Sequence, residues 1–104
     1  MKEKHFTWPG RLKNNPEHDL INAYFTIDIQ KSSEWVTELL QKTKSVRSGQ
    51  MQSWERIGNA YCLRLYSNHI EIEEDYTEAA GSITKIPITD WEAALTAWQN
   101  FISK

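Results

Sequence analysis

This chain lacks the features on which several common functions depend. It has one cysteine and four glycines among 104 residues. A single cysteine, Cys62, excludes an internal disulfide and fits a reducing compartment. The scattered glycines never form a phosphate-binding loop, which argues against nucleotide chemistry. No apolar run approaches the roughly 20 residues that cross a bilayer, and residues 1–10 show no secretion signal. We therefore expect a cytoplasmic protein with no membrane partner.

Catalytic and metal-binding patterns are also missing. The three histidines, His5, His18 and His69, are far apart and have no cysteine or carboxylate at a metal-ligand spacing. Cys62 lies between large apolar residues in a predicted strand, which is typical of an inert buried thiol. No pair of titratable groups is placed for acid–base work. We expect no enzyme activity, no metal and no cofactor.

Large rings are plentiful, and they provide the material for a core. The chain contains five Trp, four Tyr and three Phe, and each ring can bury about 150–250 Å². A length of 104 residues is typical of one domain. Pro9-Gly10 and Asn14-Asn15-Pro16 predict turns. We expect a single domain over 1–104, with residues 1–20 as a loop-rich arm packed on the body.

Hydrophobic periodicity predicts the order of the elements. Apolar residues alternate over 21–29, which indicates a strand. Ser32 to Gly49 has the cap, apolar stripe and glycine stop of a helix. Short strands follow over 52–57, 60–66, 69–75 and 81–88, and Thr89 and Glu92 predict a capping box that begins a second helix. The fold class is therefore α+β, an antiparallel four- to five-stranded sheet with helices packed on one face.

Acidic residues are concentrated between Ile70 and Glu78. Residues 1–68 contain ten Lys/Arg and seven Asp/Glu, a net of +3, whereas residues 69–104 contain two and seven, a net of −5. The run itself contains no basic residue. Strand phase predicts that Ile70 and Ile72 point inward, while Glu71 and Glu73 point outward and the acids continue into the next loop. Such a surface repels nucleic acid and attracts a basic partner.

The predicted site is this acidic surface with one aromatic anchor. Its partner-binding residues are Glu71, Glu73, Glu74, Asp75, Tyr76 and Glu78. Two other interpretations stay open. The acids can be a solvated strand edge that prevents aggregation and binds nothing. Alternatively, Trp54, Arg64 and Tyr66 can form an aromatic and arginine cluster on the other face of the sheet, which is typical of RNA- or nucleotide-binding sheets.

The segment Ser53 to Leu65, read as Ser-Trp-Glu-Arg-Ile-Gly-Asn-Ala-Tyr-Cys-Leu-Arg-Leu, resembles a segment of a small uncharacterised proteobacterial family. The segment Ile83 to Phe101, an Ile-Pro-Ile strand end followed by a Trp-containing helix, resembles the same family. The C-terminal half is also similar to immunity proteins of contact-dependent growth-inhibition systems.

The resemblance to immunity proteins implies a partner for the acidic surface. Immunity proteins are cytoplasmic and bind the toxin domain that a neighbouring cell delivers. Many such toxins are nucleases with basic active sites, which an acidic surface can occlude. The resemblance thus implies a cognate ribonuclease or deoxyribonuclease domain as partner, with no direct nucleic-acid binding. Toxin-contacting residues are not carried over from the family, so the site residues rest on charge and strand phase.

Overall fold

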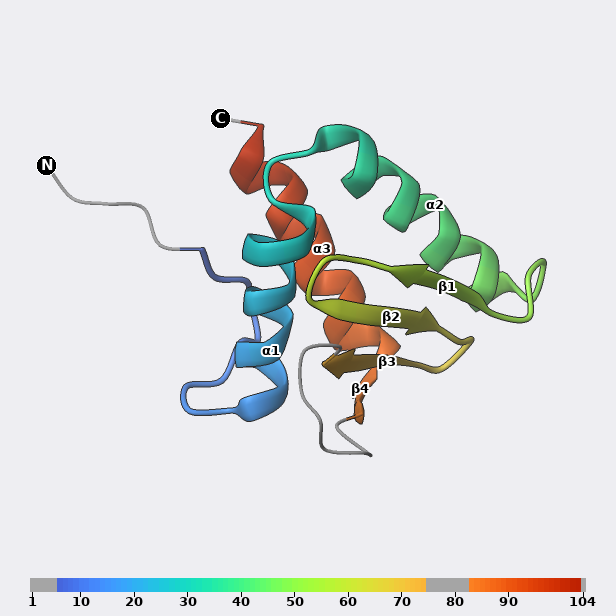
Figure 1. Ribbon diagram of the computed structural model, residues 1–104, viewed down its shortest axis with the longest axis horizontal. Helices are drawn as coiled ribbons and strands as arrows, with labels where there is room; N and C mark the ends of the chain where they lie inside the picture. Colours follow the sequence, from blue (N-terminus) through green and yellow to red (C-terminus); the bar gives the residue numbers. More distant parts are fainter. Residues whose placement is uncertain (1–5, 75–82, 104) are drawn as a thin grey trace, which may run out of the picture.

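A four-stranded antiparallel sheet forms the centre of the protein. The computed structural model describes residues 6–74 and 83–103. The strands are β1 (Trp54–Ile57), β2 (Tyr61–Leu65), β3 (His69–Glu74) and β4 (Ile83–Pro87), and they pair in the order β1-β2-β3-β4 (Figure 1). The helices are α1 (Pro16–Tyr24), the π-helix η1 (Phe25–Ile29), α2 (Ser33–Ser48) and α3 (Ile88–Ile102). The predicted α+β class is confirmed.

Alternation along the strands gives the sheet two different faces. On the inner face, Leu65 pairs with Ile70 and Leu63 pairs with Ile72, and all four side chains are fully buried. The outer face carries Arg64, which lies opposite Glu71 in the register. The predicted phase of β3 is confirmed, because its isoleucines point into the core and its alternate residues do not.

The helices pack over the inner face and against one another. Contacts join α2 to α3 and α3 to β3 and β4, and α3 runs behind the strands in the view of Figure 1. Trp91 is fully buried, and its indole Nε1 donates a hydrogen bond of 3.0 Å to Thr43 Oγ1 of α2. This bond satisfies two buried polar groups that would otherwise destabilise the interface between the two helices.

Residues 21–29 are helical, so the predicted first strand is wrong. Pro16 begins α1 within the segment that we expected to be a loop. Asn15 caps the helix, since its side chain accepts the His18 N–H at 3.1 Å, and proline suits the first helical turn. The Asn-Pro-Glu sequence that resembles a turn is therefore a helix start.

The same apolar residues that suggested a strand also fit a helical stripe. Ile21, Tyr24, Phe25 and Ile29 are buried, and their positions at i, i+3, i+4 and i+8 place them on one helix face. Ile27, which an alternating strand would bury, is 44% exposed. Burial of this stripe decides in favour of the helix, because period-two alternation and helical spacing overlap over such a short segment.

The two later helices agree with the predictions except at one end. In α2, Ser32 accepts the Trp35 N–H at 3.2 Å, and Gly49 ends the helix with φ 85°, as the cap and stop residues predicted. In α3, the predicted capping box is wrong. The helix begins at Ile88 directly after Pro87, and no side chain caps it, so Thr89 lies inside the helix.

Among the helices of the described part of the chain, none is long and apolar enough to span a membrane.

Candidate functional site

The outer face of the sheet centres on Arg64. Its Nε donates to Glu55 Oε2 at 2.9 Å, and its Nη2 donates to Glu73 Oε1 at 2.9 Å. Glu71 lies farther away, with 3.9 Å between Oε1 and Arg64 Nη1, and it also approaches His69 at 3.5 Å. The hydrogen bond to Glu73 is the largest cause that raises the pKa of Arg64 above its ordinary value. Three carboxylates from β1 and β3 therefore converge on one permanent cation.

This arrangement compensates much of the acidic character that the sequence predicted. The described outer face carries Glu55, Glu71 and Glu73 against Arg64 and Lys85, which pairs with Glu71 in the register. Three negative and two positive charges leave a net of −1. The basic partners come from neighbouring strands, so counting charge along one segment missed them.

The three predicted site residues that the structure describes, Glu71, Glu73 and Glu74, divide between the two faces of β3. Glu71 and Glu73 lie on the outer face, as predicted. Glu74 pairs with Tyr61, and strand alternation places it on the same side as Ile72, so it does not share the outer face with Glu71 and Glu73. Its role in partner binding stays a prediction. Asp75, Tyr76 and Glu78 lie outside the described residues.

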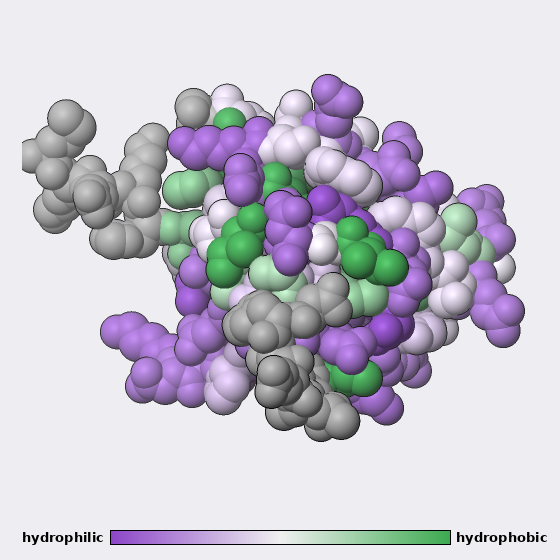
Figure 2. Space-filling model, viewed as in Figure 1, coloured by the Kyte–Doolittle hydropathy of each residue, from purple (hydrophilic) through white to green (hydrophobic). Residues whose placement is uncertain are grey.

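Apolar side chains stand beside these carboxylates. One row across the sheet joins Ile57, Cys62, Glu73 and Ile83. Ile57 is 72% exposed and Ile83 is 43% exposed, whereas Cys62 is buried, as predicted, and its thiol donates to Glu55 at 3.4 Å. Figure 2 shows this side of the molecule as mixed polar and separate apolar groups.

The expected aromatic and arginine cluster is not assembled. Trp54 pairs with Leu65 and packs against the core, so it lies on the opposite face from Arg64. Tyr66 instead stacks on His69, with 4.7 Å between ring centroids and 19° between planes. The error arose because Trp54 and Arg64 belong to paired strands, but they occupy positions of opposite phase.

Both described histidines use their two ring nitrogens. Leu12 N–H donates to His18 Nδ1 at 2.9 Å, so Nε2 carries the proton that is donated to Asp90 at 3.2 Å. His69 contacts Asn68 through Nδ1 and Glu71 through Nε2. His5 lies outside the described residues. Within the described ranges, no group of three or more His, Cys, Asp or Glu side chains is placed to hold a metal ion.

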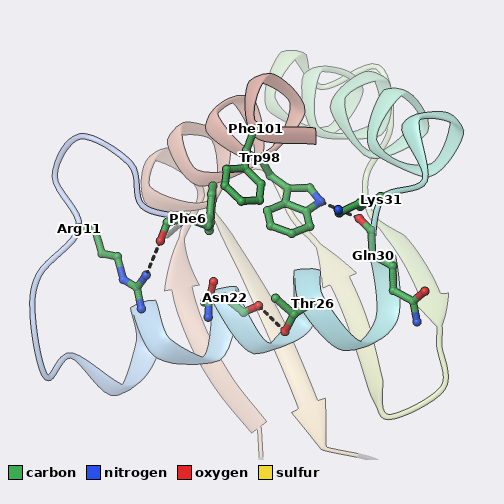
Figure 3. A pocket seen from close by; sticks show the side chains of 8 residues that line it. All are labelled: Phe6, Arg11, Asn22, Thr26, Gln30, Lys31, Trp98 and Phe101. Atoms are coloured by element: carbon green, nitrogen blue, oxygen red, sulfur yellow. Dashed lines mark hydrogen bonds between the residues drawn. The ribbon is translucent and has the colours of Figure 1, made fainter. Parts of the chain in front are cut away.

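A pocket of about 750 Å³ lies on the helical side of the molecule, where no site was predicted (Figure 3). Residues from the N-terminal segment, α1, η1, the connection between η1 and α2, and α3 line it: Phe6, Arg11, Asn22, Thr26, Gln30, Lys31, Trp98 and Phe101. The sequence did not predict this pocket, because a strand over residues 21–29 would not bring these side chains together.

Trp98 anchors the inner wall of the pocket. Its ring stacks on Phe25 with centroids 5.4 Å apart and on Phe101 with centroids 5.3 Å apart. Its Nε1 donates to the backbone oxygen of Gln30 at 2.9 Å. Phe6 meets Trp98 edge-on at 4.9 Å. The aromatic wall is therefore fixed by both ring packing and a hydrogen bond.

Residues 6–86 match the model of a protein family described as "Uncharacterised protein family (UPF0231)". A UPF0231 protein of Shewanella oneidensis is 28% identical, with 85% of this chain and 82% of the relative covered. A UPF0231 protein of Shewanella baltica is 26% identical with the same coverage. No solved structure matches this chain. Since the family model covers most of the sequence, the chain belongs to the UPF0231 family.

Proposed function

We propose that this protein is a cytoplasmic binding protein whose outer sheet face engages a basic protein partner. More specifically, we propose that it neutralises a nuclease toxin domain, in the manner of the immunity proteins that its C-terminal half resembles. One observation carries the proposal: Glu55, Glu71 and Glu73 converge around Arg64 on a face that no described helix covers.

Arg64 supports binding by holding the carboxylates in place. A carboxylate has two oxygens and about four acceptor positions, so one bond to Arg64 leaves Glu55 and Glu73 able to accept from a partner's Lys or Arg. Fixing these side chains before binding lowers the entropy that complex formation costs. The face keeps a net negative charge, which favours encounter with a basic surface.

The neighbouring isoleucines supply the apolar part of the proposed interface. Ile57 and Ile83 flank Cys62 and Glu73 in one row across the sheet. Their exposed fractions, 72% and 43%, leave surface that a partner can bury. Apolar anchors surrounded by charged groups are typical of the centre and rim of an interface. Asp75, Tyr76 and Glu78 remain part of the proposed surface.

The test is co-expression with a basic nuclease domain encoded beside the gene for this chain. We expect the wild type to protect cells, and we expect a Glu71→Lys/Glu73→Lys variant to lose protection. The matched control is Glu34→Lys/Glu38→Lys, which makes the same charge change on α2. Full protection by the Glu71→Lys/Glu73→Lys variant would sink the acidic-face mechanism, and no protection by the wild type would sink the immunity role.

The alternative function is a small RNA- or nucleotide-binding module that uses Arg64 and the stacked Tyr66. It has less support because Trp54 lies on the inner face and because carboxylates surround the one arginine that would contact phosphate. Electrophoretic mobility shift with single-stranded RNA separates the two functions. A shift at low salt that disappears at high salt favours the RNA-binding module, and no shift at low salt excludes it.

A further inference from the structure

We propose that the pocket between η1 and α3 binds a small organic anion with a planar apolar body. The apolar body would lie against Phe6 and Phe101, and the anionic group would meet Lys31. This ligand site is separate from the outer face of the sheet and does not depend on the toxin-binding proposal. Figure 3 shows its two cationic residues, Arg11 and Lys31, on different sides of the aromatic group.

The aromatic wall favours a planar ligand. Trp98 is only 3% exposed, and both Phe25 and Phe101 stack on it. The half-buried rings of Phe6 and Phe101 have centroids 5.6 Å apart and planes inclined at 64°. They offer a ring edge and a ring face at the pocket, and aromatic ligands pair with both. A volume of about 750 Å³ lies within the range of about 300–1,000 Å³ for small-molecule sites.

Charge determines which planar ligand fits. Arg11 already bonds to the Phe6 backbone oxygen at 3.1 Å and to Asp19 at 3.2 Å. Among the described residues, Lys31 makes no such bond with its ammonium group. Among the described residues that line the pocket, none carries a carboxylate, and the uncharged polar ones are Asn22, Thr26 and Gln30. A pocket with an uncompensated cation and an apolar wall favours an anion over a neutral ligand of the same shape.

Two backbone irregularities meet at the same wall of the pocket. The π-helix η1 supplies Thr26, and π-helical turns occur frequently at functional sites. Gln30 directly after it has φ 57° and ψ −142°, a conformation that is unfavourable for a non-glycine residue. The bond from Trp98 to the Gln30 oxygen and the bond from the Gln30 N–H to the Phe25 oxygen hold this conformation. The pocket wall is thus built from backbone that the surrounding contacts keep in a strained form.

A matched pair of probes tests the proposal: 2-naphthoate and its neutral analogue 2-naphthamide. Each is titrated into the full ¹⁵N-labelled chain and followed by two-dimensional NMR. The indole N–H of Trp98 is the reporter, because it lies at the pocket wall. We expect 2-naphthoate to shift the Trp98 indole and the Lys31 amide, and to bind about fivefold to tenfold more tightly than 2-naphthamide, as one charge-assisted contact provides.

Two variants separate charge-dependent binding from nonspecific hydrophobic binding. Lys31→Gln should remove the preference for the acid, while binding of 2-naphthamide stays unchanged. Lys42→Gln on α2, which does not line the pocket, should preserve the preference. The proposal is overturned if 2-naphthoate at millimolar concentration leaves the Trp98 indole unshifted. Equal affinities for the two probes in the wild type would also overturn it, because they would show that the charge of Lys31 does not contribute to binding.

Discussion

Arg64 on the outer face of the sheet lies between Glu55 and Glu73, with 2.9 Å to each. Lys31 beside the pocket has no corresponding carboxylate among the described residues. The cation of the outer face is thus paired with carboxylates, whereas the cation of the pocket is not. The sequence indicated only the outer face as a charged site. An acidic run can be compensated by a cation on the neighbouring strand, whereas a lone lysine outside any charge cluster can be the group left for a ligand.

The π-helix η1 connects this contrast to the core. Its outward residue Thr26 lines the pocket, while Asp28 points inward and is 6% exposed. The Asp28 carboxylate accepts the Ala60 N–H at 2.9 Å and the Tyr61 N–H at 3.0 Å. This buried carboxylate fixes the turn between β1 and β2, whereas the carboxylates of the outer face bond to other side chains on the same exposed face. Substitutions can therefore compare how much a buried carboxylate and an exposed carboxylate contribute to stability.

The largest expected effect is that of Asp28→Ala. It leaves two backbone N–H groups unpaired near the buried Nε and Nη1 of Arg56, which have no hydrogen-bond partner among the described residues. We expect the free energy of unfolding to fall by about 3–5 kcal/mol, because a buried charged partner is removed. Urea denaturation measures it. Glu55→Ala on the outer face is the control and should lower the free energy of unfolding by at most about 1 kcal/mol. Equal decreases for the two variants would contradict the difference between the buried and the exposed carboxylate.

Gly58→Ala should have the next largest effect. The added Cβ would collide with the Asp28 carboxylate and would lie 2.6 Å from Arg56 Nη1. We expect a loss of about 1–3 kcal/mol from overpacking, again by urea denaturation. Gly49→Asn is a useful comparison, since Gly49 has open space but φ 85°, which asparagine tolerates. A neutral Gly58→Ala would show that Asp28 does not occupy this position.

Tyr24→Phe should change the pH dependence of stability. Burial is the main cause that raises the pKa of Tyr24 above its ordinary value of 10.0. Above pH 10 the unfolded chain therefore releases this proton while the folded chain keeps it, so the wild type loses about 1.4 kcal/mol per pH unit. Below pH 10 this contribution is fully present. The variant should lose less stability on alkaline titration, because phenylalanine has no proton to release. Identical alkaline slopes would contradict the assignment.

Arg64→Gln should have the smallest effect on stability. Its ion pairs lie on the surface, where such pairs contribute about 0–1 kcal/mol and are screened by salt. Removing the cation leaves Glu55, Glu71 and Glu73 with less compensation, so any destabilisation should decrease as salt rises. Thermal unfolding at low and high ionic strength measures this. A large, salt-independent loss would mean that Arg64 is a core residue of the fold.

Local sequence patterns predicted the four strands of the sheet, but the helix over residues 21–29 depends on burial in the tertiary structure. The phase of Ile70 and Ile72 and the turns around Gly58 and Asn68 could be derived from the sequence, because strand alternation and short hairpins depend on neighbours in the chain. Residues 21–29 fit two periods, and only burial of Tyr24 against Tyr61 and Trp91 selects the helix. Asn15-Pro16 was the available signal for that helix.

The two sites could not be predicted to the same extent. Glu71 and Glu73 were placed on the correct face, but their bonds to Arg64 depend on strand pairing between segments of unknown register. The pocket required Phe6, Lys31 and Trp98 to meet from three distant segments, which no local pattern shows. It depends on the helix that the alternating pattern concealed.

The most direct test of these two opposite charge environments is a single NMR experiment on the ¹⁵N-labelled chain with two ligands added separately, 2-naphthoate and a hexalysine peptide. We predict two separate sets of shifts, with 2-naphthoate moving the Trp98 indole and Lys31 and with hexalysine moving Glu55, Glu71 and Glu73. The result that would contradict the account is 2-naphthoate acting on the outer face, or both ligands shifting the same residues.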